Sequence, residues 1–171
     1  MVTKKVIDLL NLQVQRELFS AYLYLDMALY YHDIGLVGHA HWFEIQAQEE
    51  RDHALGFIRY LQHVGEKPIL NVIDKPTLIY KDAREPLVEA LKHEKFVTAS
   101  IVNILEVAKT EKDYLTIDFL QWYIKEQGEE EKNANDNILM YDFVEGNKAA
   151  LLHIDGVHAA RKYSPSVPDI D

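Results

Sequence analysis

The sequence predicts an all-α protein, a four-helix bundle with one long crossover between helices 2 and 3 and a short fifth helix. Apolar residues recur every three or four positions over four long segments. Four of the five prolines lie in a central gap or near the C-terminus, which leaves the long segments free to be helical. At 171 residues the chain fits one domain, expected over residues 1–160, with 161–171 as a C-terminal tail.

The first two helices are expected at 4–32 and 38–64, joined by a short turn at 33–35. The second should stop at Gly65, a residue that commonly follows a helix end. Because the connection is short, the two helices should be antiparallel neighbours. The apolar face of the first helix is expected to include Val6, Leu10, Val14, Leu18 and Leu25.

Residues 66–83 break the helical pattern with two prolines and no other period. A gap of this length inside a compact domain needs a structural reason, and a crossover along the bundle supplies one. The third and fourth helices are expected at 84–112 and 115–145, and the short fifth helix at 148–159. The residues after it, rich in serine and proline, are expected to fray.

The overall charge favours small cations as ligands. There are 28 acidic against 18 basic residues, a net charge of −10. Nucleic acid is therefore not an expected partner, because phosphate binding needs a basic surface. The absence of cysteine excludes disulfides, thiolate zinc sites and iron–sulfur clusters. No signal-like or membrane-spanning apolar run is present, so we expect a cytoplasmic protein with no membrane partner.

Residues of metal-ligand type recur at a fixed offset of 77 positions. The pairs are Glu17 with Glu94, Glu50 with Gln127, and His53 with Glu130. Two copies of one helical hairpin, each directing such side chains inward, would form a metal centre in the middle of a four-helix bundle. A buried carboxylate is costly unless a cation neutralises it.

Taken singly, these residues have ordinary explanations. Glu17 and Tyr24 share one stripe of the first helix, yet a lone Glu is usually solvated or paired, and a lone Tyr is usually core. Glu50 and His53 are three residues apart and so can reach one ion. This mixed oxygen and imidazole set suits iron, manganese or zinc better than calcium.

The second hairpin adds an acid on an apolar face and an acidic run. Glu94 lies on an otherwise apolar stripe of the third helix, and residues 126–131 include Gln127 and Glu130 on the inward stripe of the fourth. Gly128, unfavourable in mid-helix, suggests close packing or space for ligand movement. Together, the four helices predict a dinuclear carboxylate metal site.

The chain resembles the non-haem bacterial and archaeal ferritins over its whole length apart from about the last ten residues. The matching pieces are Glu17 with Tyr24, residues 49–53, Glu94, and residues 119–130. The fourth-helix segment is the most specific of these. The resemblance implies a ferritin-like fold and a ferroxidase centre that oxidises Fe(II) with O₂ or H₂O₂.

The resemblance also implies roles for individual residues. The first iron would be held by Glu17, Glu50 and His53, with Glu50 bridging to a second iron held by Glu94 and Glu130. Tyr24 and Gln127 would stand next to the ions. A third inner iron site would use Glu49, Glu126, Glu129 and Glu130.

Differences from the sequence patterns of related families help to distinguish which family the chain resembles. Arg51 stands where bacterioferritins carry a haem-ligating Met, so haem is not expected. Those proteins and the rubrerythrins repeat Glu-x-x-His in the second hairpin, where this chain has Gln127 and Glu130. The mini-ferritins that protect DNA lack a fifth helix. Two other classes stay open: a di-iron oxidase or peroxidase without storage, and a helical partner protein that binds no iron.

Storage requires a container, and the resemblance implies a hollow cage of 24 identical subunits. The fifth helix would pack around the fourfold axes through Leu151, Leu152 and Val157. His153 and His158 could line that pore as ligands, but their spacing of five favours ordinary surface or packing roles.

Overall fold

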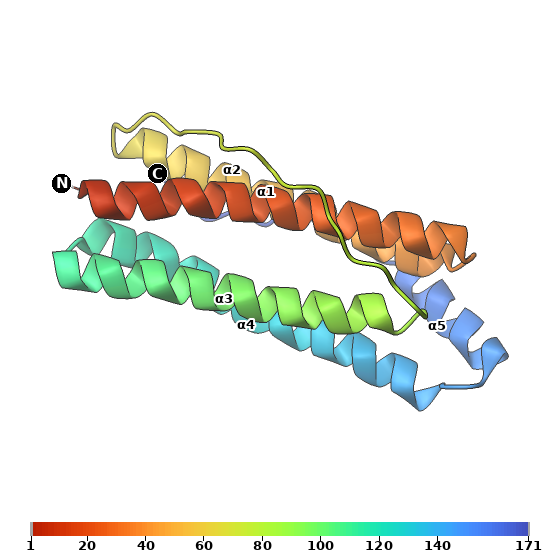
Figure 1. The fold of residues 1–171 in the computed structure, drawn as a ribbon. Coiled ribbons are helices and arrows are strands. Elements are labelled where there is room, and N and C mark those ends of the chain that lie inside the picture. The colour runs from red at the N-terminus through yellow and green to blue at the C-terminus, as the bar shows by residue number, and fades with distance from the viewer. Residues whose placement is uncertain (1, 171) are drawn as a thin grey trace.

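The computed structural model describes residues 2–170, which form an all-α fold (Figure 1). Its helices are α1 (Lys4–Asp33), α2 (Val37–His63), α3 (Glu85–Glu111), α4 (Tyr114–Phe143) and α5 (Lys148–Ala159). The predicted class and the order of the elements are confirmed, and the predicted helix ends agree with the observed ones to within two residues.

The crossover runs the length of the bundle, so α3 starts at the same end as α2 (Figure 1). It is attached to α1, since the backbone N–H of Ile69 donates to Asn11 Oδ1 at 2.7 Å. Farther along, Gln15 Nε2 donates to the carbonyl of Val72 at 2.5 Å. These contacts hold the crossover against the outer side of α1.

Local sequence signals set the helix ends. Gly65 and Gly146 follow α2 and α4 with φ angles of 84° and 77°, a left-handed conformation that favours glycine. The Asp113 side chain caps α4 by accepting from the Thr116 N–H at 3.3 Å. Asn147 caps α5 in the same way, accepting from the Ala150 N–H at 3.1 Å.

The bundle interior consists of two hydrophobic clusters separated by a polar band. The cluster near the N-terminus includes Val6, Leu10, Val14, Phe57, Val97, Ile101, Leu120 and Tyr123. The cluster near α5 includes Leu23, Met27, Tyr31, Phe43, Leu87 and Ile138. Each long helix therefore passes from one apolar cluster to the other through a short polar stretch. The predicted site residues occupy these stretches.

Helix α5 is attached to the start of α2. The Asp155 carboxylate accepts from the backbone N–H groups of Gly38 and His39, at 2.9 Å and 2.8 Å, and from His39 Nδ1 at 2.7 Å. A Cβ at Gly38 would lie 1.7 Å from the Asp155 carbonyl oxygen, so this approach requires glycine. The buried His158 ring lies 4.4 Å from the His39 ring, whereas His153 is exposed. Burial lowers the pKa of His158 to about 4, in line with a packing role.

One expectation about an individual residue was wrong, and one of the two explanations offered for another residue is excluded. Leu25, expected on the apolar face of the first helix with Val6, Leu10 and Val14, is 44% exposed on α1, where Tyr22 (51%) and Leu29 (65%) are exposed as well. Close packing does not explain Gly128, because a Cβ there would meet nothing within 4 Å. Within residues 2–170, none of the helices is both long enough and apolar enough to span a membrane.

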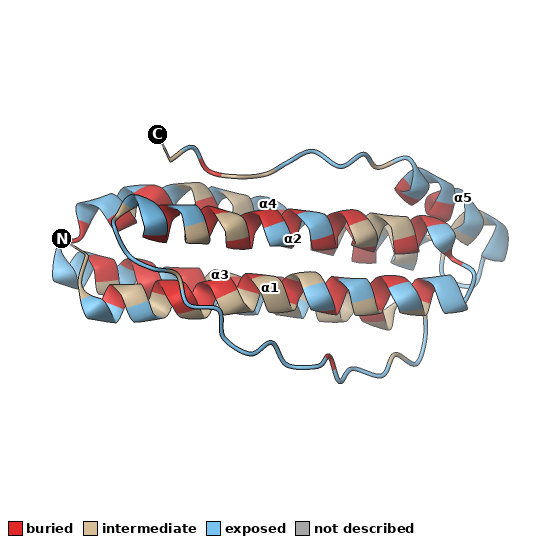
Figure 2. Ribbon diagram, turned by 90° about the horizontal axis from the view of Figure 1, so that it is seen from above, coloured by how far each residue is buried: buried red, intermediate tan, exposed pale blue. Residues whose placement is uncertain are grey.

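The crossover and the segment after α5 lie on opposite sides of the bundle (Figure 2). Residues 161–170 form no helix or strand, but they do not extend away from the bundle. Ser166 and Val167 are partly buried and Pro168 is buried. The domain boundary expected at residue 160 therefore marks the end of α5, while the segment beyond it packs on the helices.

Candidate metal centre

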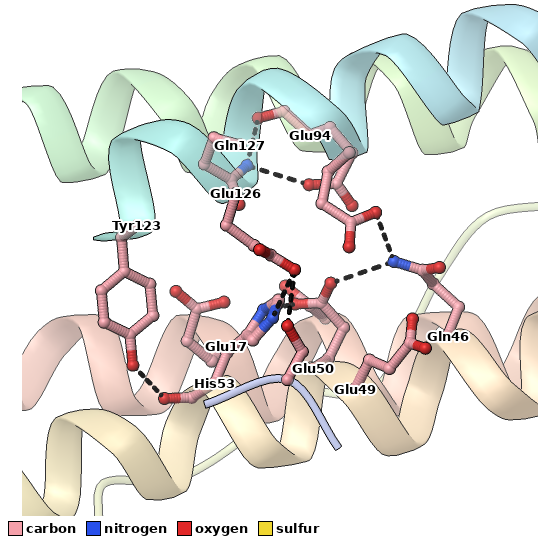
Figure 3. Close-up of polar contacts among 12 residues, drawn as sticks. Glu17, Gln46, Glu49, Glu50, His53, Glu94, Tyr123, Glu126 and Gln127 are labelled. Atoms are coloured by element: carbon pink, nitrogen blue, oxygen red, sulfur yellow. Dashed lines mark hydrogen bonds and ion pairs between the residues drawn. The ribbon is translucent and has the colours of Figure 1, made fainter. Parts of the chain in front are cut away.

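All four long helices contribute side chains to the polar band. Figure 3 shows the labelled side chains pointing into the space between the α1/α2 pair and the α3/α4 pair. The predicted ligands of the two irons are at most 5% exposed, namely Glu17, Glu50, His53, Glu94 and Glu130. So much buried negative charge is unusual in a helical core.

Glu17, Glu50 and His53 form the first group able to hold a metal. One ligand atom from each lies within 4.8 Å of the others. Glu17 Oε2 and both ring nitrogens of His53 are buried and have no hydrogen-bond partner among the described residues. Buried polar atoms are normally paired, so these atoms fit a cation placed among them. The donor set of two carboxylates and an imidazole suits such an ion.

A second group shares His53 and adds residues of α4. His53, Glu126 and Glu130 also offer ligand atoms that all lie within 4.8 Å of one another. His53 Nε2 is 3.7 Å from Glu126 Oε1, and His53 Nδ1 is 3.7 Å from Glu50 Oε2. The imidazole therefore stands between the two groups. Glu126, predicted only as a ligand of the third site, therefore lies next to His53, a predicted ligand of the first iron.

Glu94 lies at the same level but is held by hydrogen bonds. One oxygen accepts from the Tyr24 hydroxyl, and the other accepts from Gln127 Nε2 at 3.0 Å. Tyr24 and Gln127 thus stand beside the acids, where the resemblance placed them. Glu94 belongs to neither of the two metal-capable groups found among the described residues.

The remaining third-site residues are in different environments. Glu49 is 9% exposed and pairs with Arg161, whose Nη2 donates to Glu49 Oε2 at 2.5 Å. Glu129 is exposed on α4 and belongs to neither metal-capable group. Its role as a ligand stays a prediction.

Sequence reasoning missed two amides that orient the acids. Gln13 Nε2 donates to Glu17 Oε1 at 2.8 Å. Gln46 Nε2 donates to Glu130 Oε2 at 2.7 Å and lies 3.4 Å from Glu50 Oε1. Each glutamine precedes a site glutamate by four residues, so it shares that residue's helix face. This spacing could have identified both. No sequence spacing of this kind identifies Arg161 as a neighbour of the site.

Electrostatics make the band receptive to cations. Burial raises the pKa values of Glu17, Glu50 and Glu94, and raises that of Glu130 to about 7 with help from the nearby Glu94 charge. For His53, burial alone would lower the pKa, but Glu126 and Glu50 beside it raise the pKa well above its ordinary value. The carboxylates therefore favour positive charge at the centre of the band, as a metal would provide.

Aromatic residues of α4 fix the position of His53. The Tyr123 hydroxyl donates to the His53 carbonyl at 2.8 Å, and the Trp122 ring centroid lies 5.6 Å from that of His53. These contacts connect α2 to α4 beside the ligand. The imidazole is thus held between the two groups by packing as well as by charge.

Comparison with known proteins identifies the family of the chain. A family model described as a ferritin-like domain matches residues 7–139. The bacterial non-heme ferritin of Campylobacter jejuni is 34% identical over 167 residues, covering 98% of this chain and 96% of that protein. That of Staphylococcus epidermidis is 36% identical over 138 residues, covering 81% and 83%.

Solved ferritin structures are similar to the chain in both sequence and fold. A closed form of the Archaeoglobus fulgidus ferritin, engineered by site-directed mutagenesis, is 35% identical with a TM-score of 0.94, covering 96% of this chain and all of that one (100%). The open-pore ferritin of the same archaeon gives a TM-score of 0.92 at 35% identity, covering 94% and 98%. Since the family model covers most of the chain and the relatives align over nearly all of it, this protein belongs to the ferritin-like family.

Proposed function

We propose that the protein is a ferroxidase that stores iron. It oxidises Fe(II) with O₂ or H₂O₂ at a di-iron centre within one subunit and keeps the ferric mineral inside a hollow 24-subunit cage. We expect it to act in the cytoplasm and without haem. The observation that carries the proposal is the set of buried atoms on Glu17 and His53 that have no hydrogen-bond partner among the described residues.

The substrate irons would be bound by the residues of the polar band. Glu17, Glu50 and His53 would take one Fe(II), and Glu94 with Glu130 would take another, with Glu50 between them. Each Fe(II) gives up one electron, and O₂ takes both electrons and two protons to become H₂O₂. When peroxide is the oxidant, a further pair of Fe(II) reduces it with two protons to two water molecules.

The carboxylates would do more than bind. Negatively charged oxygen ligands stabilise Fe(III) over Fe(II), so they favour the oxidation. The two-electron step also avoids releasing a one-electron product of O₂. The proposed third inner site, with Glu49, Glu126, Glu129 and Glu130, would lie on the way from the pair of irons to the store.

Exposed apolar side chains support the proposed cage. Tyr22, Leu25 and Leu29 are 51%, 44% and 65% exposed on α1, and Leu152 and Val157 are 63% and 51% exposed on α5. Apolar patches of this kind usually mark interfaces. We propose that both surfaces are covered by other copies of the chain, with α5 at the fourfold axes.

Anaerobic Fe(II) titration followed by mixing with O₂ tests the proposal. We expect about two Fe(II) per chain to bind and to oxidise rapidly, because the proposed centre takes two irons. His53→Ala should slow the oxidation at least ~100-fold, since it removes the imidazole ligand proposed for the first iron. His63→Ala, an exposed histidine at the end of the same helix, is the matched control.

Particle mass separates storage from the alternatives. A species near 24 chains is expected, whereas a di-iron oxidase without storage would be no larger than a small oligomer. A partner protein without a metal centre would bind no Fe(II) and would respond equally to both histidine changes. Unchanged oxidation in His53→Ala would overturn the proposed centre.

A further inference from the structure

The segment after α5 crosses the bundle face beside the metal centre. We call residues 161–170 the C-terminal strap; it follows α2 and α4, opposite the crossover (Figure 2). At its start, the Arg161 guanidinium lies 4.3 Å over the Trp42 ring. Its Nη1 donates to Gln46 Oε1 at 2.9 Å, and its Nη2 donates to Glu49 Oε2 at 2.5 Å. The strap therefore begins with a cation placed against the acids of the centre.

Two further contacts continue along the same surface. The Tyr163 hydroxyl donates to Asp52 Oδ2 at 2.5 Å. The Ser166 hydroxyl donates to Glu126 Oε1 at 2.7 Å, the same oxygen that lies 3.7 Å from His53 Nε2. The strap thus reaches a carboxylate that itself contacts the central histidine.

The far end of the strap is fixed by packing. Pro168 is buried, and a Cβ at Gly56 would lie 3.0 Å from its Cδ and 2.2 Å from the Tyr123 hydroxyl. The close approach to α2 therefore depends on glycine at position 56. Ile170 packs against the hydrophobic cluster near the N-terminus. Attachment at both ends places the middle of the strap over the acids.

The contacted acids are those that a third metal would need. Glu49 and Glu126 belong to the proposed third site, and the strap occupies one oxygen of each. The Arg161 guanidinium lies 2.5 Å from Glu49 Oε2. A guanidinium at this position already supplies the positive charge that a metal would bring.

Building on the proposed function, we infer that Arg161 is a built-in cation that competes with metal for the third site. With the strap in place, the chain holds two metals. A third binds only when Arg161 leaves Glu49 and Ser166 leaves Glu126. The strap thereby determines how many metals each chain binds and controls passage beyond the pair.

Metal stoichiometry tests the inference directly. Co(II), which is not oxidised under these conditions, is equilibrated with the assembled protein, counted per chain and located by anomalous diffraction. We expect two Co(II) in the wild type and a third beside Glu49 and Glu126 in Arg161→Gln. The third should bind about tenfold more tightly in the variant, because one charged competitor is removed. Lys162→Gln, the same charge change at the next, exposed residue, should match the wild type.

Trp42 provides a second readout that does not depend on activity. At high Co(II), displacement of Arg161 from the Trp42 ring should change the fluorescence of Trp42, measured with Trp122 replaced by Phe because Trp122 lies beside His53. The same step should be absent in Arg161→Gln. Should that variant fold poorly, Ser166→Ala offers a milder test, with a smaller gain in third-site affinity.

Two results would overturn the inference. One is a wild type that binds three Co(II) with no change in Trp42 fluorescence. The other is a variant, Arg161→Gln or its substitute, that still binds only two. Failure of the proposed function looks different, because His53→Ala would then bind as many Co(II) ions as the wild type.

Discussion

The two halves of the bundle carry related ligand sets that differ in how fully their atoms are hydrogen-bonded. In the α1/α2 half, Glu17 Oε2 and both nitrogens of His53 have no hydrogen-bond partner among the described residues. The remaining contacts of these acids are lighter, since Gln13 donates to Glu17 Oε1 and Gln46 lies 3.4 Å from Glu50 Oε1. In the α3/α4 half, both oxygens of Glu94 accept hydrogen bonds, and Glu130 accepts one from Gln46. The sequence repeat of 77 residues therefore does not produce two equivalent half-sites.

This difference predicts unequal metal binding. A cation entering the α1/α2 half satisfies buried atoms that otherwise have no hydrogen bond, so binding relieves an existing cost. A cation in the α3/α4 half must share the acids there with the hydrogen bonds from Tyr24, Gln127 and Gln46. The second ion should be held more loosely, which suits an iron that moves on to a store.

Replacing one glutamate in each half by glutamine should reveal the difference in metal affinity most strongly. Glu17→Gln and Glu130→Gln each remove one buried negative charge with little change in shape. We expect the first to weaken the tighter Co(II) ion at least ~100-fold, and the second to weaken only the looser ion, about tenfold. Isothermal titration under identical buffer conditions measures both. Equal losses would show that the halves do not differ.

Restoring histidine in the second half should reduce the difference. Glu130→His places an imidazole at the position that corresponds to His53 and removes the acceptor of the Gln46 bond. The second ion should then bind about tenfold more tightly and leave more slowly, since less protein hydrogen bonding opposes it. Competition with a chelator gives the release rate. An unchanged rate would mean that Glu130 is not a ligand.

Much of this arrangement follows from local sequence patterns. Gly65 ends α2 as its position predicted, and the spacing of Glu50 and His53 placed both side chains toward the same ion position. These features depend on helix periodicity and backbone conformation, which neighbouring residues determine. The level at which the acids meet could be predicted because the repeat relates the two hairpins.

Contacts that are distant in sequence could not be predicted in this way. Arg161 contacts Glu49, 112 positions away in the sequence, from a segment without secondary structure. Helical periodicity therefore does not predict this pair. The exposed Leu25 fits a helical stripe, but it lies on a face that the bundle itself does not cover. Periodicity identifies an apolar face without showing whether the same chain or another copy packs against it.

The smallest expected change in metal affinity concerns the hydrogen bond from Tyr24 to Glu94, which connects the two halves. Tyr24, on α1, donates to Glu94 on α3 and so keeps one oxygen of a second-half ligand occupied. Tyr24→Phe should free that oxygen, but Gln127 still donates to the other one. We therefore expect the looser Co(II) ion to bind only about threefold more tightly, with the tighter ion unchanged. Tyr22→Phe, at an exposed tyrosine on the same helix, should have no effect.

If Tyr24→Phe instead weakened the looser ion tenfold or more, the hydroxyl would be supporting Glu94 as a ligand. The hydrogen bonds of the α3/α4 half would then orient the site rather than oppose binding.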